Sequence, residues 1–85
     1  MSYEITLSET AKLNLKALDK SIARQITQKL ESIKENPFNY VKRLVGISLF
    51  SLRVGDYRVI MEIKNKQMLI FVVRIGHRKG VYGDL

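Results

Sequence analysis

The apolar pattern of this chain changes once, at Asn36-Pro37, from a helical repeat to a strand alternation. Ahead of that dipeptide, apolar residues recur at steps of four, four and three, the period of an amphipathic helix: Ile22, Ile26, Leu30 and Ile33. Pro37 disfavours helical geometry in the residue before it and therefore ends the helix. Because 85 residues leave no room for a second core, we expect one domain, residues 1–85, with helices first and a sheet after them.

The first half also contains a strand and an earlier helix. Residues 3–7 alternate apolar and polar side chains, which predicts a short half-buried strand. Ser8 suits a helix N-cap, and an apolar face follows it at Ala11, Leu15 and Leu18. The second helix is expected to begin within residues 19–21. The two helices should therefore form a hairpin with one apolar face to bury.

The second half predicts a strand meander. Residues 49–54 and 57–63 alternate and flank the turn signal Gly55-Asp56, which indicates a β-hairpin. After a polar turn at 64–67, residues 68–75 form a nearly continuous apolar run, typical of a central strand that ends at Gly76. A short additional strand is also expected near 44–47. The fold class is α+β, in the order β-α-α-β-β-β, with the helical hairpin on one face of a mainly antiparallel sheet.

Charge is concentrated in the predicted sheet. The formal net charge is +7, which favours polyanionic partners. Residues 1–42 carry seven basic and five acidic side chains, whereas residues 43–85 carry eight basic and three acidic ones, most of the basic ones arginine. Arginine can bind phosphate through two parallel hydrogen bonds. The tract 52–82 therefore reads as a basic sheet element that presents arginines to an anionic partner, most simply RNA, although a solvated basic surface would give the same composition.

Several classes of protein are disfavoured by composition. The chain has no cysteine, so disulfides and thiolate metal sites are excluded. No spaced ligand pair predicts a metal, and no glycine-rich phosphate loop predicts a nucleotide cofactor. The N-terminus lacks the layout of a signal peptide, and no apolar run is long enough to span a membrane. We expect a cytoplasmic protein without metal, cofactor or membrane association.

Cationic and aromatic side chains gather where the predicted strands end: Arg53, Arg58, Arg74, His77, Arg78 and Tyr82. Cleavage of an RNA phosphodiester can be built from such groups, because the substrate's own 2′-hydroxyl is the nucleophile. The protein must orient that hydroxyl, stabilise charge on the transition state and assist proton transfer. Arginines suit the second task. Imidazole, which ordinarily exchanges protons near neutral pH, makes His77 a candidate for the third.

The string Leu52-Arg53-Val54-Gly55-Asp56-Tyr57-Arg58-Val59-Ile60, with Val73-Arg74-Ile75-Gly76-His77-Arg78 and the downstream Tyr82, resembles the RelE toxins of the RelE/ParE superfamily. Asn36-Pro37 and Lys42-Arg43-Leu44 fit the middle region of the same family, so the likeness spans essentially the whole chain. The resemblance implies an endonuclease that cleaves mRNA in the ribosomal A site. It also implies an acidic RelB-like antitoxin that wraps the toxin, so that the partners are antitoxin, ribosome and mRNA.

The resemblance also implies roles for individual residues. Arg58 matches the phosphate-binding arginine, Arg78 matches the arginine that stabilises transition-state charge, and Tyr82 matches a tyrosine that stacks on or orients the substrate. His77 completes the predicted catalytic set. Four more cations are expected to bind RNA: Arg43, Arg53, Arg74 and Lys79. The family pattern carries proton-transfer lysines at two positions that here hold Leu49 and Ser51.

Alternative roles stay open for several of these residues and for the whole chain. Arg53 would also fit an ion pair with Asp56 or Glu62, Arg74 a structural role, and His77 a surface or capping role. Tyr57 is expected to pack in the core. The missing lysines leave room for ParE-like inhibition of DNA gyrase without nuclease chemistry, or for an inactive toxin fold that only binds its antitoxin.

Overall fold

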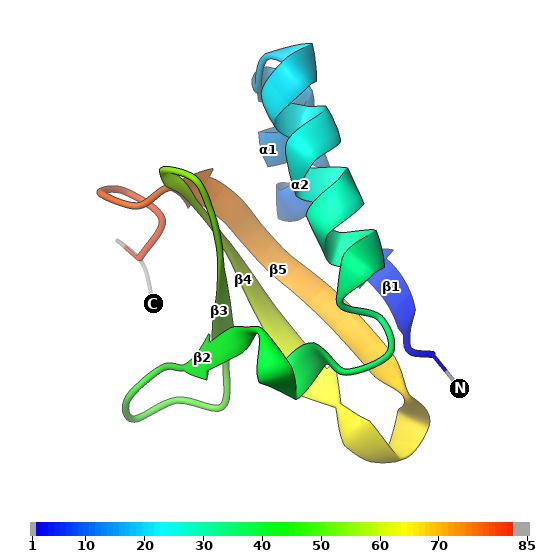
Figure 1. Ribbon diagram of the computed structural model, residues 1–85. Helices are drawn as coiled ribbons and strands as arrows, with labels where there is room; N and C mark the ends of the chain where they lie inside the picture. Colours follow the sequence, from blue (N-terminus) through cyan, green and yellow to red (C-terminus); the bar gives the residue numbers. More distant parts are fainter. Residues whose placement is uncertain (1, 83–85) are drawn as a thin grey trace.

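A computed structural model describes residues 2–82, which form two helices packed on one face of a five-stranded sheet (Figure 1). The elements follow the chain as β1 (Glu4–Leu7), α1 (Glu9–Ala17), α2 (Lys20–Ser32), β2 (Val41–Arg43), β3 (Phe50–Val54), β4 (Tyr57–Lys64) and β5 (Leu69–His77). Single 3-10 turns, Pro37–Asn39 and Asn65–Gln67, precede β2 and β5. The predicted α+β class is therefore confirmed.

The sheet has the order β1-β5-β4-β3-β2, and its strands are antiparallel except where β1 runs parallel to β5. The additional strand lies at Val41–Arg43, whereas the expected stretch 44–47 belongs to the loop between β2 and β3. β5 continues through Gly76 to His77, so Gly76 does not end it. Both helices begin as predicted, with Ser8 capping α1 through its side chain and Asp19 preceding α2.

The core lies between the helices and one face of the sheet. The helical contribution comes from Ala11, Ile26, Leu30 and Ile33. The sheet contributes alternate residues of three strands: Leu52, Val59, Met61, Ile70, Val72 and Ile75. Tyr57 packs against the edge of this core, as expected. Because side chains alternate along a strand, the residues between these positions lie on the opposite face of the sheet, which the helices do not cover.

A β-bulge in β5 decides which side chains reach that open face. Ile60 pairs with Arg74 and Met61 pairs with Val72, so Val73 has no cross-strand partner. Ser8 of the α1 cap donates a hydrogen bond to the Val73 carbonyl at 2.7 Å. The extra residue moves Arg74 onto the face of Ile60 rather than into the core. The hydrogen bond from Ser8 thus stabilises the β4–β5 register that places Arg74 on the open face.

Candidate active site on the open sheet face

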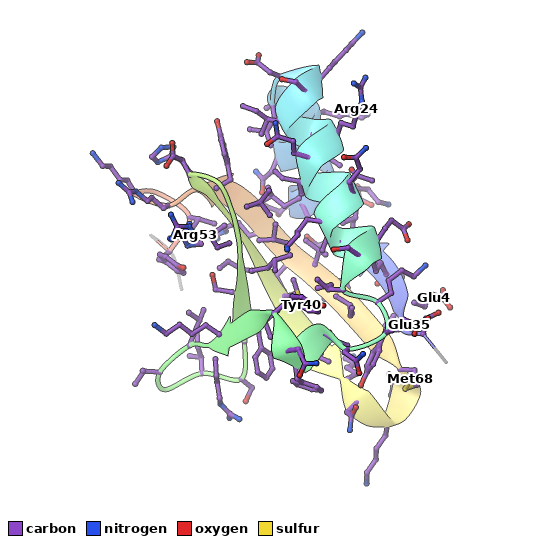
Figure 2. All side chains as sticks on the ribbon, in the orientation of Figure 1. Glu4, Arg24, Glu35, Tyr40, Arg53 and Met68 are labelled. Atoms are coloured by element: carbon purple, nitrogen blue, oxygen red, sulfur yellow. The ribbon has the colours of Figure 1, made fainter. Side chains whose placement is uncertain are left out.

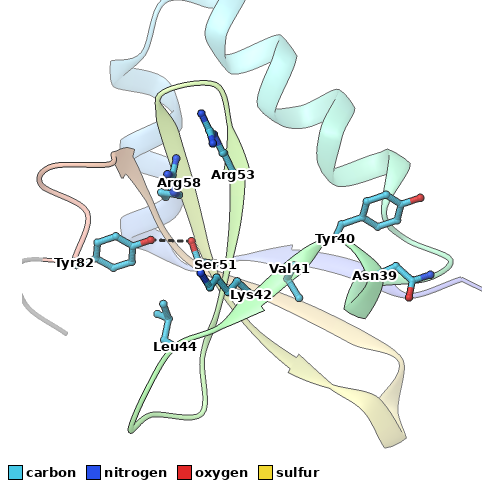
Figure 3. Close-up of a pocket in the computed structure, with 9 residues that line it drawn as sticks. All are labelled: Asn39, Tyr40, Val41, Lys42, Leu44, Ser51, Arg53, Arg58 and Tyr82. Carbon is cyan, nitrogen blue, oxygen red and sulfur yellow. Dashed lines mark hydrogen bonds between the residues drawn. The ribbon is translucent and has the colours of Figure 1, made fainter.

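A cleft of about 460 Å³ lies on the open face, between β2, the β3–β4 hairpin and the end of the described chain (Figure 3). Nine residues line it: Asn39, Tyr40, Val41, Lys42, Leu44, Ser51, Arg53, Arg58 and Tyr82. The ring of Tyr40 points away toward α2, where the Lys29 ammonium lies 5.3 Å from its centroid. With Tyr40 set aside, the polar side chains that line the cleft are two guanidinium groups, one ammonium group, two hydroxyl groups and the carboxamide of Asn39.

Arg53 and Arg58 occupy directly opposite positions of the β3–β4 ladder. The two-residue turn at Gly55 and Asp56 fixes this register, and Gly55 has the left-handed φ of +59° that favours glycine at such a position. Like charges in direct cross-strand opposition destabilise a sheet. Within residues 2–82 neither guanidinium forms an ion pair with a carboxylate. The alternative role of Arg53, an ion pair with Asp56 or Glu62, is thus absent from the described part of the chain.

Each guanidinium donates to a neighbouring backbone carbonyl. Arg53 Nε reaches Gly55 O at 3.4 Å, and Arg58 Nη1 reaches Tyr57 O at 3.2 Å. A guanidinium carries five N–H donors, so these bonds use a small part of its capacity. The nine lining residues include no carboxylate. A concave surface with two opposed guanidinium groups and no acidic side chain is suited to an anion with several oxygens, such as a phosphodiester.

Tyr82 reaches the cleft because the chain reverses after β5. The amides of Gly80 and Val81 both donate to the His77 carbonyl, at 2.9 and 3.0 Å. Val81 is then buried against Gly76, where an added Cβ would lie 3.4 Å from the Val81 side chain. Arg74 Nη1 donates to the Val81 carbonyl at 3.1 Å. These contacts hold the segment against the open face, and the hydroxyls of Tyr82 and Ser51 are 2.9 Å apart (Figure 3).

The structure brings together three of the residues singled out from the sequence, Arg53, Arg58 and Tyr82. Arg74 lies on the same sheet face, but its described contact is with the C-terminal segment. Arg78 and Lys79 are exposed in the turn after β5. The amide of Arg78 donates to Asp56 O at 2.9 Å, so this turn lies beside the β3–β4 hairpin turn.

Two predicted site residues lie on the helix side of the sheet. His77 pairs with Tyr57, and their rings meet edge to face at 5.7 Å, whereas Arg58 pairs with Gly76 on the other face. The Nδ1 atom of His77 accepts a bond from the Lys79 amide at 3.3 Å, which is the capping role considered above. Arg43 pairs with Phe50 and its guanidinium lies 6.0 Å from that ring. Neither side chain shares the cleft with Arg58.

Sequence reasoning missed Lys42 and the contact of Ser51 with Tyr82. Lys42 pairs directly with Ser51 in the β2–β3 ladder, which places both on the open face. An extra strand was expected at 44–47; a strand at 41–43 would have placed Lys42 and Arg43 on opposite faces by alternation. Among residues 2–82, no group of three or more His, Asp and Glu side chains could hold a metal ion, and no helix is long and apolar enough to cross a membrane.

The helical layer, the mixed sheet and the cationic cleft define a small α+β protein with a candidate site on the uncovered sheet face. A model of the family described as the ParE toxin of the type II toxin–antitoxin system, parDE, matches residues 5–82. The chain belongs to this toxin family, within the RelE/ParE superfamily. The resemblance drawn from its motifs is thereby confirmed.

Individual relatives agree with this assignment. A RelE-like toxin protein of Escherichia coli is 30% identical over 82 residues, which cover 93% of this chain and 86% of the relative. The mRNA interferase toxin RelE of Escherichia coli is 24% identical with the same coverage. A chain in the crystal structure of the toxin–antitoxin complex RelBE2 from Mycobacterium tuberculosis has a TM-score of 0.85 at 23% identity, covering 92% of this chain and 100% of that one. The last similarity concerns the fold alone.

Proposed function

We propose that this toxin is a ribosome-dependent endoribonuclease that cleaves mRNA in the A site. The observation that carries the proposal is the opposed pair of Arg53 and Arg58 in a cleft without a lining carboxylate. A surface with that charge is suited to a polyanion, and the 24% identical relative is an mRNA interferase. Cleavage of ribosome-bound mRNA would take place in the cytoplasm, so we also propose that this is a cytoplasmic protein.

In the proposed reaction the 2′-oxygen of the nucleotide before the scissile bond attacks the phosphorus, and the bond from phosphorus to the 5′-oxygen breaks. The products are a 2′,3′-cyclic phosphate and a free 5′-hydroxyl. Charge on the phosphoryl oxygens grows in the transition state, where Arg53 and Arg58 stabilise it. Tyr82, which lines the cleft and is partly exposed, offers a ring on which a base of the message stacks. Arg78 adds positive charge from the neighbouring turn.

The test uses purified ribosomes stalled with a defined codon in the A site and an end-labelled message. We expect cleavage at that codon, with a 2′,3′-cyclic phosphate on the upstream fragment, and little cleavage of the same message without ribosomes. The matched control is Arg24→Ala, which removes an exposed guanidinium from α2, away from the cleft (Figure 2). An intact message with the parent protein would refute the nuclease assignment.

A second function, inhibition of DNA gyrase, is favoured first by the matching family model, which describes a ParE toxin. Leu49 and Ser51, at positions where RelE-type toxins carry lysines, point the same way. This function predicts loss of gyrase supercoiling and DNA damage on expression, with the message intact. Measuring supercoiling by purified gyrase beside the ribosome assay separates the two activities, and expression with no growth defect would indicate that the chain only binds a partner.

The partner we propose is an acidic, partly disordered RelB-like antitoxin. The chain carries a formal charge of +7, and charge complementarity accelerates and orients such associations. The mycobacterial structure with the similar fold is a toxin–antitoxin complex. We expect a small acidic reading frame beside this gene whose product, when co-expressed, relieves growth arrest. Absence of rescue would exclude that product as the antitoxin.

A further inference from the structure

Cleavage of a phosphodiester requires a proton to reach the departing 5′-oxygen, and few groups in the cleft can deliver one. Arginine does not release its proton in proteins, so Arg53 and Arg58 stabilise charge without donating protons. The hydroxyls of Tyr82 and Ser51 are paired with each other at 2.9 Å. His77 lies on the other face of the sheet beside Tyr57. Among the nine lining residues three side chains are cationic, and Lys42 is the one of these that can release its proton.

The position of Lys42 is set by the β2–β3 ladder. It is the direct partner of Ser51, so its side chain leaves β2 on the open face, and it extends toward the Ser51 side of the cleft (Figure 3). Ser51 is in turn the partner of Ile60, two residues along β4 from Arg58. Lys42 therefore lines the cleft from β2, the strand next to β3, which carries Arg53. Its neighbours in sequence, Val41 and Arg43, are turned to the helix side.

We propose that Lys42 is the catalytic acid of this toxin and replaces the lysines that the family pattern places at the positions of Leu49 and Ser51. The proposal rests on the proposed nuclease function. In this step the Lys42 ammonium donates a proton to the 5′-oxygen as the phosphorus–oxygen bond breaks. The proton of the 2′-hydroxyl passes to water as the new bond forms, and water then reprotonates the Lys42 amine. In this proposal the proton donor is still a lysine, but it comes from β2.

The test compares two messages in the stalled-ribosome assay under single-turnover conditions. One is ordinary RNA, and the other carries sulfur in place of the 5′-bridging oxygen at the scissile bond. A thiolate leaves without being protonated, so the sulfur message needs no acid. We expect Lys42→Met to cleave ordinary RNA about 100-fold more slowly than the parent and the sulfur message at about the parental rate. Lys42→Arg keeps the positive charge but holds its proton, and we expect the same pattern from it.

The controls separate this step from the rest of the proposal. Lys66→Met removes an exposed ammonium from the turn between β4 and β5 and should behave as the parent on both messages. Thermal melting of each variant checks that the fold is retained. Parental cleavage of ordinary RNA by Lys42→Met, or an equal defect on both messages, would overturn the role of Lys42 while leaving the nuclease assignment intact. Failure of the parent protein on both messages would refute the nuclease assignment and, with it, this step.

Discussion

The two faces of the sheet are built from the same strands but have opposite properties. On the helix side, alternate residues of β3, β4 and β5 are buried against Ile26, Leu30 and Ile33. On the open side, the intervening positions of β3 and β4 carry Arg53 and Arg58, with no lining carboxylate beside them. The first arrangement lowers the free energy of the fold by removing apolar surface from water. The second raises it, because like charges face each other.

This difference separates the residues that stabilise the fold from the residues that form the candidate site. A charge pair that destabilises the isolated chain is expected at a site that binds an anion. Two adjacent residues of β3 show this difference. Leu52 is 1% exposed and lies in the core, whereas Arg53 is exposed on the other face. Substitutions on the helix side should therefore change stability, whereas substitutions in the cleft should change activity with little effect on stability.

The largest effect is expected from Arg58→Ala. We expect the rate of message cleavage to fall about 10³-fold, close to 4 kcal/mol of transition-state stabilisation, because this guanidinium is preorganised for the growing phosphoryl charge. The free energy of unfolding should stay the same or rise, since a repulsion with Arg53 is relieved. Single-turnover cleavage and urea unfolding measure the two quantities. A variant that loses stability and activity together would contradict the division between the faces.

The converse substitution is Ile26→Ala on the helix side. Ile26 is fully buried, so its truncation removes apolar contact and leaves a cavity. We expect unfolding free energy to fall by about 3 kcal/mol. At a temperature where both proteins are folded, cleavage of the message should be within about twofold of the parent, because this residue lies across the sheet from the cleft. A large loss of activity in a fully folded sample would show that the faces are coupled.

The sequence was sufficient to predict the helix side of this fold. The repeat from Ile22 to Ile33 and the alternation of residues 49–63 are strong periodic signals, and they specify the buried faces directly. The opposition of Arg53 and Arg58 also follows from a two-residue turn at Gly55-Asp56. These features are local, because each depends on residues close together in the chain.

The placement of side chains on the open face could not be predicted in the same way, because it depends on strand pairing that a local sequence pattern does not contain. β2 has three residues, too few for a recognisable alternation, so the placement of Lys42 and Arg43 on opposite faces could not be read from the sequence. The bulge at Val73 changes the face of Arg74, and it is fixed partly by Ser8, which is 65 positions away. His77 was predicted beside Arg58 from its place in a motif, but the register of β4 and β5 separates them.

A smaller effect is expected from the hydroxyl pair that ties Tyr82 to Ser51. Tyr82→Phe keeps the ring and removes one partner, and Ser51→Ala removes the other. We expect each change to slow message cleavage about fivefold, because a neutral hydrogen bond contributes about 1 kcal/mol to positioning. The double variant should be no slower than either single one, which a double-mutant cycle on single-turnover rates would measure. Additive losses would mean that the two hydroxyls act separately on the substrate.

The smallest effect is expected from His77→Ala, and it tests the comparison of the faces most directly. The ring lies with Tyr57 on the helix side, and its Nδ1 accepts from the Lys79 amide, so its loss should loosen the turn that carries Arg78 and Lys79. We expect less than about fivefold slower cleavage on both ordinary and sulfur-substituted messages, since a positioning change does not depend on the leaving group. A residue that exchanges protons with the substrate would instead lose about 100-fold on ordinary RNA and recover on the sulfur message. That outcome would require the ring to leave Tyr57 and cross to the cleft on ribosome binding. It would assign to His77 the role of catalytic acid that we propose for Lys42.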